Sequence, residues 1–260
     1  MLNRKLPWSV SALGVLVLTA PLAARAAVIP PVVEFYVDGV FQNAYTCLDP
    51  EFDCTNPSEV GFFAFLQDPE WDISISAAFY PDSTIEPSPQ IVYSSAVTDR
   101  NVANTFSFVF YQDVASVLGS VMHENSSSST DSTTNGVAVT PIAPQPGIPV
   151  DSDGIPELAV YTLSTDGGAS YVNAGLDLRA AFVGGPGPNS DTQTGLSQSG
   201  AGPGGPYDRM RVDVSFGLPG SDDSYTSGGK VLLVVPEPMS LGLLGLGLVA
   251  LGLAGRRRHS

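Results

Sequence analysis

The sequence predicts a mostly β protein whose central body is an antiparallel β-sandwich or a jelly roll. Apolar and polar residues alternate with a period of two in one short segment of that body after another. Pro, Gly, Asp and Asn separate the segments, and no long segment has the periodicity of a helix. Each end of the chain instead has a longer apolar run beside basic residues, which predicts an N-terminal signal peptide and a single C-terminal transmembrane helix.

Residues 1–26 have the three parts of a signal peptide. Arg4 and Lys5 supply the positive start, an uncharged apolar run follows, and Ala24 and Ala26 form a small-x-small cleavage site. An uncleaved signal anchor is the alternative, because the apolar run is almost long enough to span a bilayer. The Ala-rich exit favours cleavage.

About ten segments of the body show the strand pattern. In chain order they are residues 31–40, 59–66, 71–80, 90–97, 104–113, 115–124, 157–164, 175–183, 208–217 and 230–235. In residues 208–217 those expected to face the core are Met210, Val212, Val214 and Phe216, and those expected to face solvent are Arg209, Arg211, Asp213 and Ser215.

Two stretches break the strand pattern and are predicted to be long loops. Residues 125–136 are a polar run of low complexity, which is a candidate for O-linked sugar, and residues 184–206 are rich in Gly and Pro. Either stretch is also compatible with a linker between two domains. The segments between them are short for independent domains, which favours loops within one domain.

Residues 27–235 form a strongly acidic body, with 25 Asp and Glu residues against five Lys and Arg residues, a net charge of −20. Such a surface repels nucleic acid and attracts divalent cations. We therefore expect no nucleic-acid partner. All 12 Phe and all nine Tyr residues lie in this body, so it has the side chains for a substantial core.

Cys47 and Cys54 are the two cysteines of the chain. An isolated close pair in an exported protein predicts a disulfide, which would close the loop between them. A metal site or a catalytic thiol is less consistent with the sequence, because no histidine lies nearby.

The stretch DSDGIPE offers the best candidate for a metal site. Asp151, Asp153 and Glu157 could supply oxygen ligands for calcium, and the glycine between them allows a sharp turn. A full EF-hand loop is excluded, because its fifth and twelfth positions would be Ile155 and Thr162. The alternative is a solvated acidic turn before a strand. No other cofactor is expected.

The body lacks the common catalytic motifs. It has a single histidine, His123, and contains no G-x-S-x-G elbow, no H-E-x-x-H helix and no phosphate-binding G-x-x-x-x-G-K-[ST] loop. These absences favour a body that is not an enzyme. The enzymatic alternative is a pair of carboxylates that acts on a polysaccharide, and the sequence gives no means to choose the pair.

The last residues of the chain read PEPMSLGLLGLGLVALGLAGRRRHS. The 17 residues 239–255 carry no charge. At a rise of ~1.5 Å per residue they form a helix of about 25 Å, slightly short of a ~30 Å hydrocarbon core. The basic residues after this span are expected to stay on the cytoplasmic side as a stop-transfer signal, and they are Arg256, Arg257 and Arg258.

The triplet Pro236-Glu237-Pro238, the short Gly/Leu-rich span and the basic end together resemble the PEP-CTERM sorting signal of exported bacterial proteins, over residues 236–260. The resemblance implies that a membrane-embedded transpeptidase of the exosortase type recognises the tail. It also implies cleavage near the triplet, transfer of the body to the cell surface or matrix, and an association with exopolysaccharide.

These observations together favour a non-enzymatic surface or extracellular-matrix protein, held in the membrane by its C-terminal helix until it is processed. A polysaccharide-binding module is the second hypothesis. In that hypothesis Trp71, Tyr80 and Tyr93 stack on sugar rings, although a tryptophan on a strand is more often part of a core.

Overall fold

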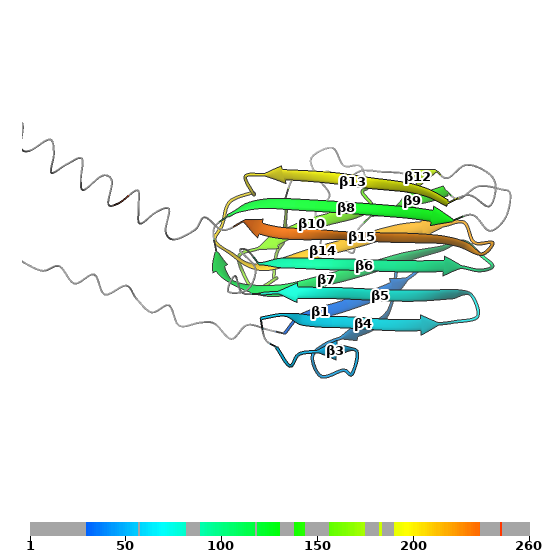
Figure 1. Ribbon diagram of the computed structural model, residues 1–260, viewed down its shortest axis with the longest axis horizontal. Coiled ribbons are helices and arrows are strands. Elements are labelled where there is room, and N and C mark those ends of the chain that lie inside the picture. Colours follow the sequence, from blue (N-terminus) through cyan, green and yellow to red (C-terminus); the bar gives the residue numbers. More distant parts are fainter. Residues whose placement is uncertain are drawn as a thin grey trace, which may run out of the picture.

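The computed structural model describes residues 30–56, 58–81, 89–117, 119–130, 138–143, 156–174, 182–183, 190–234 and 245. Within these ranges the protein is mostly β, and its strands pair antiparallel in two sheets that pack against each other (Figure 1). The predicted fold class is confirmed to that extent. The predicted signal peptide lies outside the described residues, as does the predicted helix over 239–255 apart from Gly245. No helix in the described ranges is long and apolar enough to cross a membrane.

The first sheet has the order β11-β10-β14-β7-β1-β2, with β9 also paired to β14 and β12 paired to β9. Its strands are β1 (Val32–Val37), β2 (Val40–Tyr45), β7 (Asn104–Val117), β9 (Ala138–Pro141), β10 (Ala159–Ser164), β11 (Val172–Asn173), β12 (Phe182–Val183) and β14 (Tyr207–Leu218). β14 is central because it pairs with β7 along one side and with β10 and β9 along the other.

The second sheet has the order β13-β8-β15-β6-β5-β4-β3 and faces the viewer in Figure 1. Its strands are β3 (Phe52–Asp53), β4 (Val60–Gln67), β5 (Trp71–Tyr80), β6 (Gln90–Asp99), β8 (Ser120–Thr130), β13 (Ser190–Gly200) and β15 (Asp223–Val234). β15 ends at the same end of the sandwich at which β1 begins (Figure 1).

The core lies between the sheets, where alternate residues of the facing strands meet. In β5 the inward residues Ile73, Ile75 and Phe79 are fully buried, as the alternation predicts. Aromatic contacts cross between the sheets: the rings of Tyr93 and Phe110 stack with centroids 5.4 Å apart. The four apolar residues predicted to face inward on β14 are all buried, which confirms that part of the prediction.

About half of each predicted long loop is strand, so the prediction is wrong for those residues; residues 131–136 and 184–189 lie outside the described residues. Residues 125–130 belong to β8, and residues 190–200 form β13, which pairs with β8. The serine run forms a strand because β15 and β13 supply backbone hydrogen-bond partners on both of its sides. Its alternate residues Ser127 and Ser129 face the interior and are buried, which leaves them inaccessible to glycosylation.

Candidate functional site

A group of polar side chains covers part of the outer face of the first sheet. We call it the outer polar cluster, and its members are Glu34, Tyr36, Tyr111, Asp113, Arg209, Arg211 and Asp213. They come from β1, β7 and β14, which are adjacent in the sheet. The register of β14 against β7 places Arg209 opposite Asp113 and Arg211 opposite Tyr111, so complementary groups meet across the strands.

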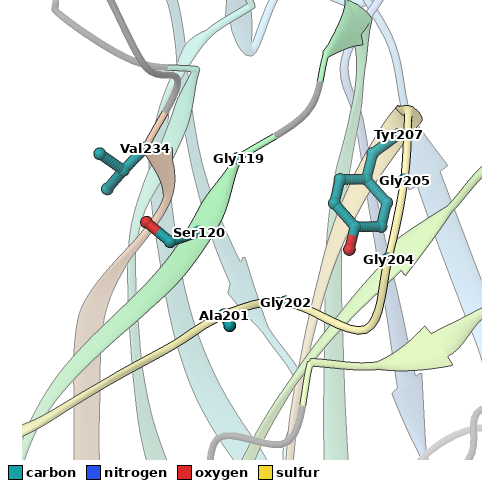
Figure 2. Close-up of a pocket in the computed structure, with 8 residues that line it drawn as sticks. All are labelled: Gly119, Ser120, Ala201, Gly202, Gly204, Gly205, Tyr207 and Val234. Carbon is teal, nitrogen blue, oxygen red and sulfur yellow. The ribbon is translucent and has the colours of Figure 1, made fainter.

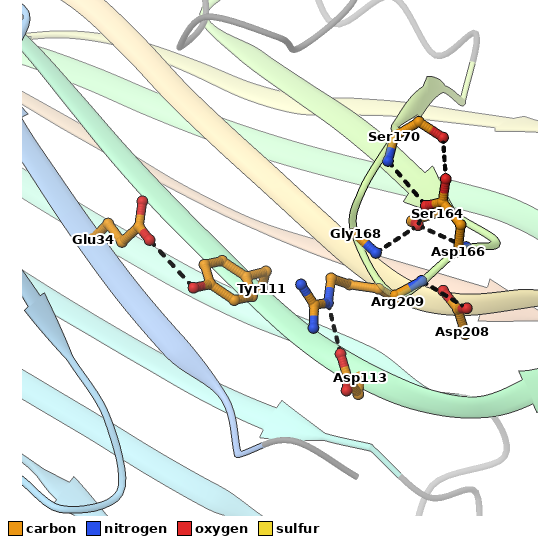
Figure 3. Close-up of polar contacts among 10 residues, drawn as sticks. Glu34, Tyr111, Asp113, Ser164, Asp166, Gly168, Ser170, Asp208 and Arg209 are labelled. Atoms are coloured by element: carbon orange, nitrogen blue, oxygen red, sulfur yellow. Dashed lines mark hydrogen bonds and ion pairs between the residues drawn. The ribbon is translucent and has the colours of Figure 1, made fainter. Parts of the chain in front are cut away.

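One half of the cluster is a carboxylate that accepts hydrogen bonds from two phenols. The hydroxyl of Tyr36 donates to Oε2 of Glu34 at 2.8 Å. The hydroxyl of Tyr111 donates to Oε1 of the same carboxylate at 3.2 Å (Figure 3). Burial, together with the adjacent Glu34 carboxylate, raises the pKa of Tyr36 to about 12. Both phenols therefore remain protonated donors at neutral pH.

The other half of the cluster consists of two arginine–aspartate pairs. Arg209 Nε lies 2.6 Å from Oδ1 of Asp113 (Figure 3), and Arg211 reaches both oxygens of Asp213 at 2.7 Å. Asp213 was expected to face solvent, but its side chain is fully buried, and that expectation is wrong. Burial raises the pKa of the Asp213 carboxyl, and the bidentate Arg211 contact offsets part of that effect. Ser215 is buried as well and not exposed as predicted.

Tyrosine rings stack on both arginines of the cluster. The guanidinium carbon of Arg209 lies 5.3 Å from the ring centre of Tyr111, and that of Arg211 lies 5.2 Å from the ring centre of Tyr171. The result is a half-buried surface of aromatic rings with charged groups between them.

Two further acidic residues, Asp166 in the turn after β10 and Asp208 on β14, accept hydrogen bonds from that turn. Asp166 accepts hydrogen bonds from the backbone and the hydroxyl of Ser170 and from the hydroxyl of Ser164 (Figure 3). These bonds, those from Ser170 above all, lower the pKa of Asp166 to about 2. Asp208 accepts from the backbone nitrogen of Gly167 at 2.9 Å. These carboxylates therefore shape the turn.

His123, the one histidine of the body, is fully buried between the sheets. Its Nε2 lies 2.9 Å from the hydroxyl of Tyr93, which also accepts a hydrogen bond from the amide of Asn125. Burial lowers the pKa of His123 to about 3, so the ring is neutral at physiological pH. A buried, neutral imidazole in this position has no path to a substrate in solvent.

The three aromatic residues expected to bind sugar do not form one platform. Tyr93 is buried against His123, so its predicted role is wrong. Trp71 and Tyr80 are the first and last residues of β5, and Trp71 packs edge-on against Phe35 with centroids 6.1 Å apart. The hydroxyl of Tyr80 donates to Glu59.

The calcium hypothesis remains a prediction. Asp151 and Asp153 lie outside the described residues, and Glu157 is buried just before β10. Among the residues that the structure describes, no three His, Cys, Asp or Glu side chains are grouped to hold a metal ion. A rise in melting temperature with calcium that D151N/D153N abolishes would support the hypothesis, and an unchanged melting temperature would contradict it.

The predicted disulfide is confirmed, because Cys47 and Cys54 are bonded to each other. Both cysteines are partly buried and pack against the core. The loop that they close places Phe52 on the core, where its ring lies 4.8 Å from that of Phe62. The bond therefore has a structural role at the edge of the second sheet.

A hollow of about 430 Å³ lies at the end of the sandwich where β15 ends (Figure 2). Its lining is mostly glycine backbone and small side chains, and consists of Gly119, Ser120, Ala201, Gly202, Gly204, Gly205, Tyr207 and Val234. Tyr207 and Ser120 are the only lining side chains with a polar group, and neither has a charged or basic partner in the lining.

Comparison with known proteins assigns the C-terminus and leaves the body unassigned. No curated protein matches the chain. Among solved structures, the crystal structure of the RrgA Jo.In complex aligns with 74% of this chain and 76% of that one, at 14% identity and a TM-score of 0.19, values too low to indicate a shared fold.

A family model of the PEP-CTERM protein-sorting motif matches residues 234–258. The matched range includes the predicted triplet Pro236-Glu237-Pro238 and Arg256, Arg257 and Arg258, all of which lie outside the described residues. The chain thus ends in a PEP-CTERM protein-sorting motif, which identifies it as an exported protein whose membrane-passing precursor is sorted to the surface by an exosortase.

Proposed function

We propose that the β-sandwich is a non-enzymatic module of the cell surface or extracellular matrix, associated with exopolysaccharide after sorting. The observation that carries this proposal is the junction at Val234. The last strand of the sandwich ends at this residue, and the match to the sorting motif begins at the same residue. Since no linker separates the last strand from the motif, an enzyme that cleaves the tail would transfer the sandwich as one unit.

The polar groups of the sandwich support a structural role. Glu34, Asp113 and Asp213 each accept from a tyrosine or an arginine, and His123 is buried. Groups satisfied in this way stabilise a fold and are poorly placed to attack or protonate a substrate.

The sorting step is tested in the host with a variant of the triplet. In cells that produce P236A/E237A/P238A, we expect the uncleaved chain to accumulate in the membrane fraction and to be lost from the surface. The matched control is S240A, which changes a residue of the same matched range outside the triplet. Equal surface delivery of all three proteins would contradict sorting through the triplet.

The association with exopolysaccharide is tested by fractionation of the extracellular polymer. We expect the wild-type protein to sediment with the polymer and to be released when a glycosidase degrades the polymer. The protein itself should leave the length of the polymer unchanged. Shortening of the polymer by the purified protein would instead show an enzyme.

A polysaccharide-binding module is the second candidate, and the outer polar cluster favours it. Tyr36, Tyr111 and Tyr171 are half-buried, and arginines and carboxylates lie between them, a mixture that suits both the faces and the hydroxyls of sugars. A glycan array separates the candidates: binding that Y171A removes supports the module, and an array without binders counts against it.

A further inference from the structure

Two phenylalanines stand exposed side by side on the outer face of the second sheet. Phe63 and Phe65 of β4 are 59% and 57% exposed, while their neighbours Phe62 and Ala64 face the core. They are separated by one residue, so their rings project from the same face about 7 Å apart. An aromatic pair left in water lacks the stabilisation that burial of each ring would provide, and such an exposed apolar pair is typical of an interaction surface. We call this pair the phenylalanine ridge.

A flat area of small residues adjoins the ridge. The pairing register continues from Phe63 through Ser76 and Ser94 to Gly228, and from Phe65 through Ser74 and Ala96 to Thr226. We call these six small residues the shelf; they belong to β5, β6 and β15. None has a side chain as tall as a phenyl ring, so the ridge stands above the shelf along one side.

The shelf is uncharged in a body that has a net charge of −20. Charged residues surround this uncharged area: Asp72 lies in the row on one side, and Lys230 and Glu124 lie in the row on the other. At the β3 edge, Glu51 lies beside Phe63, and the backbone nitrogen of Phe63 donates to the backbone oxygen of Glu51. Two copies of so acidic a body repel each other over most of their surfaces. The ridge and shelf form a face on which two copies can approach closely without bringing like charges together.

Ridge and shelf are complementary to each other under two-fold symmetry. A two-fold axis that runs parallel to the strands, in the plane between the two copies and above the border of ridge and shelf, places the ridge of each copy over the shelf of the other. Such an isologous contact uses the same surface twice and closes as a dimer. Sheets packed face to face lie about 10 Å apart, a spacing that phenyl rings from one sheet fill against Ser, Ala and Gly of the other.

We propose that this face binds a second copy of the same chain, with the phenylalanine ridge of each copy packed on the shelf of the other. Four strands at ~4.8 Å spacing and about 20 Å along the strands give roughly 400 Å² per copy. That area is about half of the ~800 Å² per partner found in stable interfaces, so the dimer is weak in solution and forms at high concentration. Many copies held at one surface raise the local concentration. The inference does not depend on an association with exopolysaccharide.

The test is analytical ultracentrifugation of the exported protein over a range of concentrations. We expect the wild type to dimerise, and F63S/F65S, which removes the ridge, to raise the dissociation constant at least tenfold. S94R, which places a charged side chain on the shelf, should have the same effect from the opposite side of the contact. The matched control is F41S, since Phe41 is 53% exposed but lies on β2 of the other sheet.

The melting temperatures of the four proteins should agree closely, because all four substituted positions are at the surface. A wild type that stays monomeric at every concentration would overturn the proposal, as would a dimer unaffected by either F63S/F65S or S94R. A monomeric wild type that binds a polysaccharide through Phe63 and Phe65 would show that the face receives a sugar polymer instead.

Discussion

The hydroxyl of Tyr93 lies 2.9 Å from Nε2 of His123 in the interior of the sandwich, where neither ring reaches solvent. Asn125 donates to the same hydroxyl oxygen at 3.0 Å, which leaves the hydroxyl hydrogen for the imidazole nitrogen. The pair joins β6 to β8 through side chains and sets two properties of the core: its response to acid and its tolerance of added volume.

Acid should destabilise the protein through His123. Burial lowers the pKa of this imidazole to about 3 in the folded state, whereas the unfolded value is ~6.5. Between these values the unfolded chain binds a proton that the folded chain does not. The free energy of unfolding therefore falls as the pH drops below ~6.5, by up to about 1.4 kcal/mol per pH unit.

The measurement compares urea unfolding of wild type and H123Q at pH 7 and at pH 4.5. Between pH 7 and pH 4.5 we expect the free energy of unfolding of wild type to fall by about 2–3 kcal/mol more than that of H123Q, because glutamine does not titrate. The comparison cancels the buried carboxyls Asp99 and Asp213, whose pKa values burial raises and which therefore act in the opposite direction. Parallel pH profiles would show that His123 is solvated in the folded state.

Gly229 of β15 provides the space for the phenol of Tyr93. A Cβ at this position would lie 2.5 Å from the hydroxyl of Tyr93 and 2.3 Å from the backbone oxygen of Glu124. We expect G229A to lower the free energy of unfolding by about 1–3 kcal/mol, because the strand and the ring must move apart. The matched control is G228A, whose Cβ would meet its nearest atom at 3.3 Å and should change stability by less than about 1 kcal/mol. Equal effects of the two changes would refute this account.

Of the arginines that the structure describes, Arg211 should be the most costly to remove. Its guanidinium makes two hydrogen bonds to the fully buried Asp213, so R211M leaves an uncompensated buried carboxylate. We expect a loss of about 3–5 kcal/mol in urea unfolding. The matched control is R100M: Arg100 pairs with Asp72 at the surface, with 41% of its side chain exposed. That pair should contribute less than about 1 kcal/mol. A similar cost for both variants would mean that burial does not decide the strength of these pairs.

The alternation of residue types predicts those strands that have one apolar and one polar face. β5, β6, β7 and β14 lie where the sequence places them, because each has a core face that must be apolar. The serine run of β8 gives no such signal, since Ser127 and Ser129 face an interior that is locally polar, beside Ser227 and Asn125. The backbone partners that make this run a strand come from β13 and β15, far away in the sequence.

The candidate sites were harder to predict than the strands. Asp213 occupies a position that alternation assigns to solvent; Arg211 lies on the same strand two residues away, but only the folded structure shows that the side chain of Asp213 is buried. The exposed pair Phe63 and Phe65 lies within a run of apolar residues, where the alternation cannot distinguish the inner face from the outer. The sorting motif was predictable because its order of residues is itself the signal.

Loss of the disulfide should loosen the edge of the second sheet and leave the rest folded. Cys47 and Cys54 close a loop with a sequence separation of 7, for which the chain-entropy model gives about 2–3 kcal/mol. We expect urea unfolding of C47S/C54S to give a free energy of unfolding that is lower by that amount. The variant should lose hydrogen-exchange protection first at β3 and β4, because the loop places Phe52 on Phe62. A reductant should shift wild type to the stability of the variant and leave the variant unchanged. If the reductant also destabilises C47S/C54S, the shift does not arise from this bond.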